Sequence, residues 1–479
     1  MSDILLTEVN ASYIRITCEE HIETELWEYF TFEAPNARFD PRVKNRVWDG
    51  KLHLYNKKSR QIYRGLFGRL MLWAAEHEYH VELEGDFYRA KAPPEDFVDS
   101  LDLPVHIKDR WYQKDSFEEA VKMKRNITLL STAGGKSLII YMLMRYHQKK
   151  TLIIVNTLGL IDQMKRHFGE YGYDVEENVH CIYGGITKTT DKHVTIATWQ
   201  SIYQQPKEWY DDYELVIGDE VHLFDAKSLQ GIMVNARFAW YRYGFTGTLK
   251  ESKCHHLVLE GLFGPVFQPT STIELAEQGY IARPKINVLI FDHKKEYREL
   301  AYTMDYQEEM KLICGMEKRN HYIANLALNL RGNTLVLFRF LEEHGKPLMM
   351  LLKAQNGAPP LHYVDGNTEK DLREQIRQFI IGGKTSINIC SYGVFSTGID
   401  IPNLDNIVFA SPYKSKVKVL QSIGRGLRLS EGKTHCNIYD LVDDLTWRGE
   451  ENYTLKHYMD RIRYYNEEEF DYKQYRIEI

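Results

Sequence analysis

The sequence predicts an α/β protein with two successive doubly wound parallel-sheet lobes behind a small α/β domain. Short apolar runs alternate with helical stretches in two series, which is the pattern of buried parallel strands joined by helices. The first series of predicted strands comprises Ile127–Leu130, Thr151–Val155, Val194–Ala197 and Leu215–Ile217. The second comprises Thr334–Phe338, His362–Val364, Ile387–Cys390, Ile407–Ala410 and Asn437–Leu441.

Changes in composition predict where these parts begin and end. The Pro93-Pro94 pair separates the lobes from a different N-terminal segment, and Ala276–Pro284 is typical of a linker between lobes. We therefore predict an accessory domain at 1–95, a first lobe at 96–274 and a second lobe at 275–450. The charged, tyrosine-rich remainder at 451–479 is expected to be a helical tail.

The composition is that of a globular protein. The chain has 479 residues, 43% hydrophobic and 27% charged, and can bury several cores. No apolar run approaches the roughly 18 residues of a membrane span, and Asp3 and Glu8 stand where a signal peptide would be basic and apolar. We expect a cytoplasmic protein with no membrane partner. Six scattered cysteines without a CxxC pair argue against a zinc ribbon or a disulfide framework.

The predicted accessory domain contains a concentrated basic segment, although the net charge of the chain is −6. Between residues 38 and 70, ten lysines and arginines stand against two aspartates, and Trp48, Tyr55, Tyr63 and Phe67 lie among them. Basic side chains interleaved with aromatic ones are typical of a nucleic-acid-binding surface. A merely solvated basic hairpin is the alternative interpretation.

A phosphate-binding loop is predicted directly after the first strand. The segment Ser131-Thr132-Ala133-Gly134-Gly135-Lys136-Ser137 leads from that strand into an apolar helix. Backbone N–H groups of such a loop cradle phosphates, Lys136 would reach the β- and γ-phosphates of a nucleotide, and Ser137 would ligate Mg²⁺. The strict G-x-x-x-x-G-K-[ST] pattern fails at Leu130, so a simple glycine turn is the alternative for this loop taken alone.

Two adjacent carboxylates support the nucleotide prediction. Asp219 and Glu220 follow the apolar run Leu215–Ile217, and His222 stands two residues further on. Asp219 would hold Mg²⁺, Glu220 would orient or deprotonate the attacking water, and His222 would couple the site to the next motif. The alternative, a strand-end turn with solvated acids, is disfavoured by the phosphate loop upstream.

These motifs resemble those of superfamily 2 helicases over about residues 107–430. The similar segments occur in the order of that family: Arg110–Gln113, Thr132–Ser137, Leu152–Gln163, Thr195–Ser201, Asp219–His222, Phe245–Thr248, Ser396–Pro402 and Gln421–Arg428. The chain departs from the family pattern at Leu130, Asn156 and Gly218. The resemblance implies two RecA-like lobes, with a DExH sequence at Asp219–His222, that use ATP and Mg²⁺.

The resemblance also implies roles for further residues. It assigns nucleotide binding to Arg110, Gln113, Thr132, Ala133, Gly134, Gly135 and Asp400, the last on the ribose. It assigns coupling between the motifs to His222, Thr246, Thr248 and Gln421. It places Thr157, Thr198 and Thr397 on the nucleic-acid backbone, where contacts position the strand without reading its sequence.

Arg425 and Arg428 are the candidate arginine fingers. They are spaced by one helical turn in the second lobe, and together they can point at the γ-phosphate of ATP held by the first lobe. Because phosphoryl transfer needs charge neutralisation more than covalent help, such a pair makes hydrolysis depend on lobe closure. With Lys136 and Glu220, these arginines complete the predicted catalytic set.

The accessory domain resembles that of the UvsW-type helicases of tailed bacteriophages, which are RecG-like. The resemblance rests on Phe39-Asp40-Pro41, Trp48-Asp49-Gly50-Lys51, Leu54-Tyr55 and Gly65-Leu66. It implies a domain that binds duplex DNA ahead of the motor, and Arg42, Lys44, Arg46 and Lys51 are the candidate contacts. It also implies work in the cytoplasm of an infected bacterium.

The predicted function is that of a monomeric ATP-dependent DNA helicase or translocase that remodels branched DNA in phage recombination, repair and replication. The implied activities are fork regression, branch migration and R-loop unwinding, with an RNA–DNA hybrid as a further candidate substrate. The alternatives are a restriction-type motor, an RNA helicase of the same superfamily, or an ATP-gated nucleic-acid binding or annealing module. Strand polarity, step size, protein partners and the role of the tail stay open.

Overall fold

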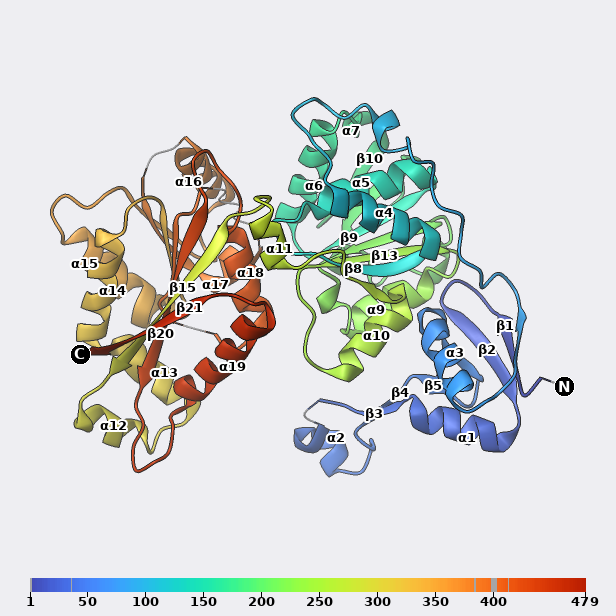
Figure 1. Ribbon diagram of the computed structural model, residues 1–479, viewed down its shortest axis with the longest axis horizontal. Coiled ribbons are helices and arrows are strands. Elements are labelled where there is room, and N and C mark those ends of the chain that lie inside the picture. Colours follow the sequence, from blue (N-terminus) through green and yellow to red (C-terminus); the bar gives the residue numbers. More distant parts are fainter. Residues whose placement is uncertain (1, 36, 383–384, 398–402, 412) are drawn as a thin grey trace. The chain divides into compact units, whose positions relative to one another are not determined.

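The computed structural model describes residues 2–35, 37–382, 385–397, 403–411 and 413–479 (Figure 1). The chain divides into two compact units, one containing Met1–Leu130 and Gly135–Pro269, the other Ser131–Gly134 and Thr270–Ile479. Within the described ranges, no helix is both long and apolar enough to cross a membrane.

The first unit begins with a mixed five-stranded sheet in the order β5-β6-β2-β1-β7. Strands β1 and β7 pair in parallel, whereas the other neighbours are antiparallel. The strands are β1 (Ile4–Glu8), β2 (Tyr13–Cys18), β5 (Tyr55–Asn56), β6 (Gln61–Tyr63) and β7 (Val81–Glu84). Helices α1 (Glu20–Tyr29) and α3 (Phe67–Glu76) and the 3₁₀ turn η2 (Arg64–Leu66) pack with this sheet.

A basic arm extends from this sheet between α1 and β5 (Figure 1). We define it as residues 31–53. It consists of the antiparallel pair β3 (Thr31–Glu33) and β4 (Lys51–His53), the 3₁₀ turn η1 (Ala37–Phe39) and the short helix α2 (Pro41–Lys44). The chain leaves the arm and enters the sheet at Leu54, which lies between β4 and β5.

The first lobe is a seven-stranded parallel sheet in the order β10-β11-β9-β12-β13-β8-β14. Its strands are β8 (Arg125–Leu129), β9 (Thr151–Val155), β10 (Val179–Ile182), β11 (Val194–Thr198), β12 (Leu215–Asp219), β13 (Tyr241–Thr246) and β14 (Val266–Phe267). Its helices are α4 (Trp111–Met123), α5 (Lys136–His147), α6 (Leu158–Glu170), α7 (Val175–Asn178), α8 (Trp199–Ile202), α9 (Lys227–Asn235) and α10 (Lys253–Phe263). The four predicted strands are confirmed, whereas β10, β13 and β14 were not predicted.

The second lobe, in the second unit, repeats this design with a parallel sheet in the order β17-β18-β16-β19-β20-β15-β21. Its strands are β15 (Arg283–Asp292), β16 (Thr334–Phe338), β17 (Leu361–Val364), β18 (Ile387–Ser391), β19 (Asn406–Phe409), β20 (His435–Asp444) and β21 (Tyr472–Glu478). Its helices are α11 (Thr272–Glu277), α12 (Lys295–Ala301), α13 (Tyr306–Gly315), α14 (Glu317–Asn329), α15 (Lys346–Lys353), α16 (Lys370–Ile381), α17 (Tyr392–Thr397), α18 (Lys416–Gly426) and α19 (Tyr453–Glu467), and a π-helical turn (Leu341–Gly345) precedes α15. Central strands such as β16 are buried at every position, because helices cover both faces.

The structure contradicts one expectation from the sequence. The tail is not wholly helical, because α19 is followed by β21, which pairs in parallel with β15 and extends the sheet. Its many exposed polar and charged residues suit an edge strand, which needs polar side chains on its exposed positions. The connection within the predicted linker Ala276–Pro284 is shorter than that stretch, because α11 ends at Glu277 and β15 begins at Arg283.

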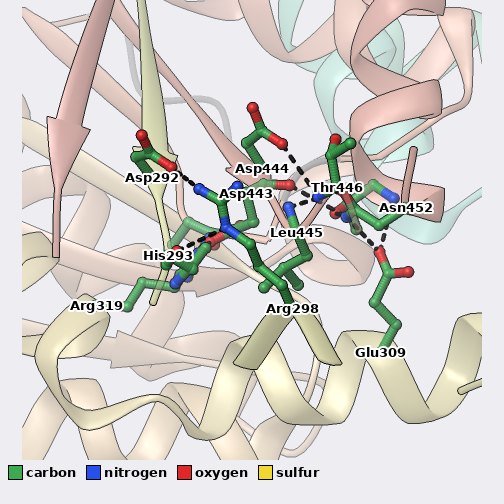
Figure 2. A network of polar contacts seen from close by, with 12 residues as sticks. Asp292, His293, Arg298, Glu309, Arg319, Asp443, Asp444, Leu445, Thr446 and Asn452 are labelled. Atoms are coloured by element: carbon green, nitrogen blue, oxygen red, sulfur yellow. Dashed lines mark hydrogen bonds and ion pairs between the residues drawn. The ribbon is translucent and has the colours of Figure 1, made fainter. Parts of the chain in front are cut away.

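A buried polar network fixes the carboxyl ends of β15 and β20 (Figure 2). The Asp443 carboxylate accepts hydrogen bonds from Arg319 Nε at 2.8 Å and Arg319 Nη2 at 3.0 Å, and lies 2.9 Å from His293 Nε2. Burial by itself would raise the pKa of Asp443, but Arg319 and His293 lower it to about 2. Glu309 accepts from the backbone N–H groups of Tyr453 and Thr454, and so caps the start of α19.

We expect Asp443→Asn to destabilise the second unit by about 3–5 kcal/mol, because it leaves Arg319 buried without a counterion. The pKa of Asp443 is lowered, so its stabilising contribution is fully present above about pH 4 and disappears as the pH falls toward 2. Denaturant unfolding at pH 7 measures the loss. The matched control is Asp460→Asn, which removes a half-exposed pair with Lys414 and should cost less than about 1 kcal/mol. Equal effects of the two substitutions would contradict this assignment.

Candidate active site

The phosphate loop connects β8 to α5 at the carboxyl edge of the first sheet. Gly135 has a left-handed backbone with φ +77°, a conformation that favours glycine. A Cβ there would also overlap the side-chain amide of Gln113. The loop closes on itself through a hydrogen bond of 2.9 Å from the Gly134 N–H to the Ser131 carbonyl. This is the strand–loop–helix geometry of a phosphate site.

Leu130, the departure from the strict loop pattern, anchors the loop. It is buried, and its N–H donates to the Thr246 carbonyl at 3.0 Å. Its own carbonyl accepts from Lys136 Nζ at 3.2 Å. The loop is therefore attached to β13 at its start, and the lysine side chain folds back over the loop.

Gln113 braces the loop from α4. Its Oε1 accepts from the Arg110 backbone N–H at 2.9 Å, and its Nε2 donates to the Gly135 carbonyl at 3.3 Å. Arg110 donates from Nη1 to the Tyr112 hydroxyl at 2.7 Å. Arg110 and Gln113, two of the residues that the resemblance assigns to the nucleotide, thus stand together at the beginning of α4, beside the loop.

The paired carboxylates stand at the end of β12. Asp219 is the last residue of that strand and is buried, and Glu220 follows with a left-handed backbone at φ +55°. Such a conformation is uncommon for a side chain other than glycine, and at a strand end it turns the residue out of the sheet. The Glu220 N–H donates to Asp219 Oδ1 at 3.0 Å.

A small network joins Glu220 to the end of β13. His222 Nδ1 lies 3.0 Å from Thr246 Oγ1 and 3.2 Å from Glu220 Oε2. Thr246 Oγ1 also donates to the Thr248 carbonyl at 3.0 Å. The structure therefore brings together Glu220, His222, Thr246 and Thr248, as the predicted coupling requires, within the first unit.

The environment of Asp219 fits a metal ligand. Burial and the neighbouring Glu220 carboxylate raise the pKa of Asp219 to about 6, against the opposing effect of Lys136. A buried carboxylate with a raised pKa needs a neighbouring positive charge to stay ionised. A divalent cation bound by Asp219 and by the Ser137 hydroxyl at the start of α5 would supply that charge.

A separate pocket of about 440 Å³ lies where β9, β10 and β11 end. Thr157 and Thr198, both predicted to contact nucleic acid, line it together with Asn156, Gly184 and Lys188, and four further residues complete the lining: Leu158, Gln200, Ser201 and Gln204. Thr198 Oγ1 lies 2.8 Å from Ser201 Oγ, and Gln200 donates to the Asn156 carbonyl. The departure at Asn156 therefore lies on the wall of this pocket.

The four N-terminal candidates for DNA contact lie on the basic arm, away from that pocket. Lys44, Arg46 and Lys51 are exposed, whereas Arg42 pairs with Asp40 at 2.7 Å and lies over the Trp48 ring at 4.9 Å. The Arg42 hydrogen bonds lower the pKa of Asp40 to about 2. Phe39 and Val47 are 61% and 78% exposed on the same arm. The arm is thus a basic surface with apolar side chains on it.

In the second lobe, Gln421 and Arg425 lie on α18, and Arg428 follows just after this helix ends at Gly426. The Lys433 ammonium donates to the Gly426 carbonyl at 2.6 Å and so stabilises the end of the helix. Thr397 ends α17. Asp400 lies outside the described residues.

Several residues of the site escaped the sequence analysis. Gly184 and Lys188 follow β10, which was not predicted, so no strand end was expected there. Lys433 stands in a polar turn, and only its burial indicates a role. Gln200 and Ser201 lie within the recognised segment Thr195–Ser201, so the motif itself could have indicated them.

Two RecA-like parallel sheets, the first with a phosphate loop and a DExH strand end, define a superfamily 2 helicase motor. Family models match the description "DNA helicase UvsW, N-terminal" at residues 3–84, "Type III restriction enzyme, res subunit" at 106–251 and "Helicase conserved C-terminal domain" at 317–430.

Whole-chain similarities narrow this class. The ATP-dependent DNA helicase uvsW of Enterobacteria phage T4 is 35% identical over 96% of this chain and 97% of its own. The crystal structure of T4 UvsW matches with a TM-score of 0.53 and 33% identity over 99% of both chains. The DNA 3'-5' translocase XPB2 of Sulfurisphaera tokodaii is 28% identical over 75% of this chain and 87% of its own. The chain belongs to the UvsW family of helicases, as the accessory-domain motifs predicted.

We expect Asp219→Asn to stabilise the nucleotide-free protein at pH 8 by about 1–3 kcal/mol, because it removes a buried charge whose pKa is raised. The cost of that charge is absent below about pH 4, grows as the pH rises to 6 and is constant above it. Denaturant unfolding at pH 5 and pH 8, with ATP hydrolysis measured in parallel, tests this. The exposed Asp191→Asn is the control. A variant no more stable than the wild type at pH 8 would show that Asp219 is not strained.

Proposed function

We propose that this chain is an ATP-dependent DNA helicase that remodels branched DNA by fork regression, branch migration and R-loop unwinding. The observation that carries the proposal is the similarity to the T4 helicase over both the motor and the accessory domain. The work would take place in the cytoplasm of the infected cell, with the chain acting as a monomer.

The nucleotide site supports a specific division of labour. Loop N–H groups from Thr132 to Gly135 would bind the phosphates of ATP, and Lys136 would leave the Leu130 carbonyl to meet the β- and γ-phosphates. Ser137 and Asp219 would hold Mg²⁺, which supplies charge neutralisation at the phosphates. Glu220 would orient and deprotonate the attacking water, with its carboxylate held by His222 and Thr246.

The remaining assignments extend this scheme. Arg110 and Gln113 would contact the base, Asp400 the ribose, and Gln421 would help couple hydrolysis to movement. Thr157, Thr198 and Thr397 would contact one DNA strand through its phosphates, and the pocket beside Thr157 and Thr198 has the polar lining that such contacts need. Arg42, Lys44, Arg46 and Lys51 would hold duplex DNA on the arm.

A substrate panel tests the function. Duplex forks, Holliday junctions, R-loops, RNA duplexes and single strands are each incubated with protein, ATP and Mg²⁺, and both strand separation and ATP hydrolysis are followed. We expect ATP-dependent unwinding of the branched DNA substrates. Unwinding confined to RNA would indicate an RNA helicase, translocation without unwinding a restriction-type motor, and annealing without turnover a binding module.

Lys136→Ala and Glu220→Gln should separate binding from chemistry. Lys136→Ala should lose most ATP affinity, because the phosphates lose their ammonium, whereas Glu220→Gln should bind ATP but not hydrolyse it. Nucleotide titration and single-turnover hydrolysis distinguish the two effects, with DNA binding as the folding control. Normal turnover by folded Glu220→Gln would remove its assigned role.

Arg425→Ala and Arg428→Ala should bind ATP almost normally and lose DNA-stimulated hydrolysis. An arginine finger is worth about 10³–10⁵ in rate, so a loss of at least about 10² is expected. Lysine should rescue poorly, because a point charge does not reproduce the planar fork. Steady-state ATPase with and without DNA measures this, and full stimulation in both variants would refute the finger assignment.

Alanine at Arg42, Lys44, Arg46 and Lys51 together should weaken binding to branched duplex DNA more than it changes basal ATPase. Each lost phosphate contact should reduce the log–log salt slope by about 0.9 in magnitude. The control removes four lysines elsewhere in the first unit: Lys91, Lys149, Lys207 and Lys227. If both sets change the slope equally, the arm is only a solvated basic surface.

A further inference from the structure

The accessory domain and the first lobe share one hydrophobic core. Buried residues of β1, β2 and α3, such as Leu6, Ile14 and Leu70, belong to the same packed cluster as Ile127 of β8 and Phe263 of α10. Helix α10 contacts the turn η2 of the accessory domain as well as β8 and β13. The domain is therefore seated on the lobe and is not a tethered module.

The loop between β1 and β2 is held by the lobe at two buried residues. The Ala11 N–H donates to the Arg237 carbonyl at 2.9 Å. The Ser12 hydroxyl lies within hydrogen-bond distance of the Val234 carbonyl at 3.1 Å and the Met233 carbonyl at 3.2 Å, both in α9. The Ser12 carbonyl accepts from the Arg64 N–H, which ties the loop back into its own domain.

Two buried arginines of the first lobe donate hydrogen bonds to the same loop. Arg242, on β13, donates from Nη2 to Ser12 Oγ at 2.8 Å and to the Ala236 carbonyl at 2.7 Å. Arg125, the first residue of β8, donates from Nη2 to the Ala11 carbonyl at 2.9 Å. Across the described residues, neither guanidinium forms an ion pair, although both are buried. We call these four residues, Ala11, Ser12, Arg125 and Arg242, the clamp.

The placement of the clamp links it to the nucleotide site. Arg125 and Arg242 are paired in register at the amino ends of β8 and β13. The carboxyl ends of the same two strands lead into the phosphate loop and carry Thr246, which contacts His222. The strands are five and six residues long, so the clamp and the nucleotide site are separated by roughly 16–20 Å of directly paired backbone.

We propose that the clamp is a positioning element that makes the basic arm a rigid extension of β8 and β13. Structural changes at the phosphate loop and Thr246 during ATP turnover then move the first lobe and the arm together relative to the DNA. In this way ATP hydrolysis drives remodelling. The proposal deepens the proposed function and rests on it: the clamp sets how much DNA is remodelled per ATP and not how fast ATP is hydrolysed.

A steric variant tests the contact between the accessory domain and the first lobe. It lies outside both the nucleotide site and the basic arm. A Cβ on Gly65, in η2, would overlap the Glu260 carbonyl of α10 and come within 2.7 Å of the Gly261 carbonyl. Gly65→Ala should therefore push the accessory domain off the lobe. Gly68→Ala, one turn away on α3, meets nothing within 4 Å and is the matched control. Ser12→Ala, which deletes only the clamp hydroxyl that accepts from Arg242, is measured alongside Gly65→Ala, tests the clamp itself and should show the same change in a weaker form.

Two measurements are made on the full chain: strand separation per ATP hydrolysed on a branched DNA, and the distance between labels at positions 47 and 227. We expect Gly65→Ala to keep DNA-stimulated hydrolysis within about threefold but to lose about tenfold in separation per ATP, with a broadened label distance. Gly68→Ala and the wild type should show one narrow distance in every nucleotide state.

The outcomes separate the two proposals. A wild type that hydrolyses ATP without remodelling any branched DNA refutes the proposed function, while the label distances still test the rigid seat. A broad distance in the wild type overturns the clamp. So does a Gly65→Ala variant that remodels as efficiently as Gly68→Ala, or one that loses hydrolysis and remodelling in equal proportion.

Discussion

The first unit depends on the pairing of two parallel strands, β8 and β13. Each carries a buried arginine at its amino end and ends at the nucleotide site, and their register places Arg242 beside Arg125 and Thr246 beside Leu129. The hydrogen bond from the Leu130 N–H to the Thr246 carbonyl continues this pairing into the phosphate loop. Because paired strands cannot slide by less than a full register step, the two ends of this ribbon stay fixed relative to each other.

The two units differ in whether their buried charged side chains have counterions. In the second, Asp443 is neutralised by Arg319 and His293, and the network fixes α19 and the strand ends. In the first, burial and the nearby guanidinium of Arg64 lower the pKa of Arg242 to about 9, and burial raises that of Asp219. Uncompensated buried charges destabilise a fold, so the arginines at the amino end of the β8–β13 ribbon and Asp219 at the end of the neighbouring strand β12 point to function and not to stability.

The sequence predicted the motor better than its surroundings, and the reasons are physical. Buried parallel strands such as Thr151–Val155 are continuous apolar runs and were found to the residue. Strand β13 was missed because Arg242, Tyr241 and Gly244 interrupt its apolar pattern, and β21 because it is a polar edge strand. The motif residues around Lys136 and Glu220 could be predicted because their spacing is local, whereas Thr246 was predicted only from the family resemblance.

What the sequence could not show is contact between distant segments. Nothing in the order of residues connects Ser12 with Arg242, since the contact exists only once two domains share a core. Likewise, the expected boundary near Pro93-Pro94 marks where one sheet ends and the next begins, yet the core continues across it. Polar residues in a short loop, such as Asn10 and Ser12, do not indicate that the loop contacts a second domain.

Gly218, the unusual glycine before the DExH carboxylates, is also part of the packing between the first lobe and the accessory domain. Gly218 of β12 faces Gly244 of β13, and a Cβ on Gly218 would come within 2.9 Å of the Phe263 ring, while one on Gly244 would come within 3.2 Å of it. The two glycines thus form a notch that lets α10 approach the sheet closely. That same helix presents Gly261 to Tyr63 of the accessory domain, again at a distance that leaves no room for a larger residue. A Cβ at position 218 would come within 2.7 Å of Val221, which follows Glu220, so a side chain there would displace the DExH turn as well as α10. The departure from the family motif is therefore explained by close packing against Val221 and against α10, the helix that also contacts the accessory domain.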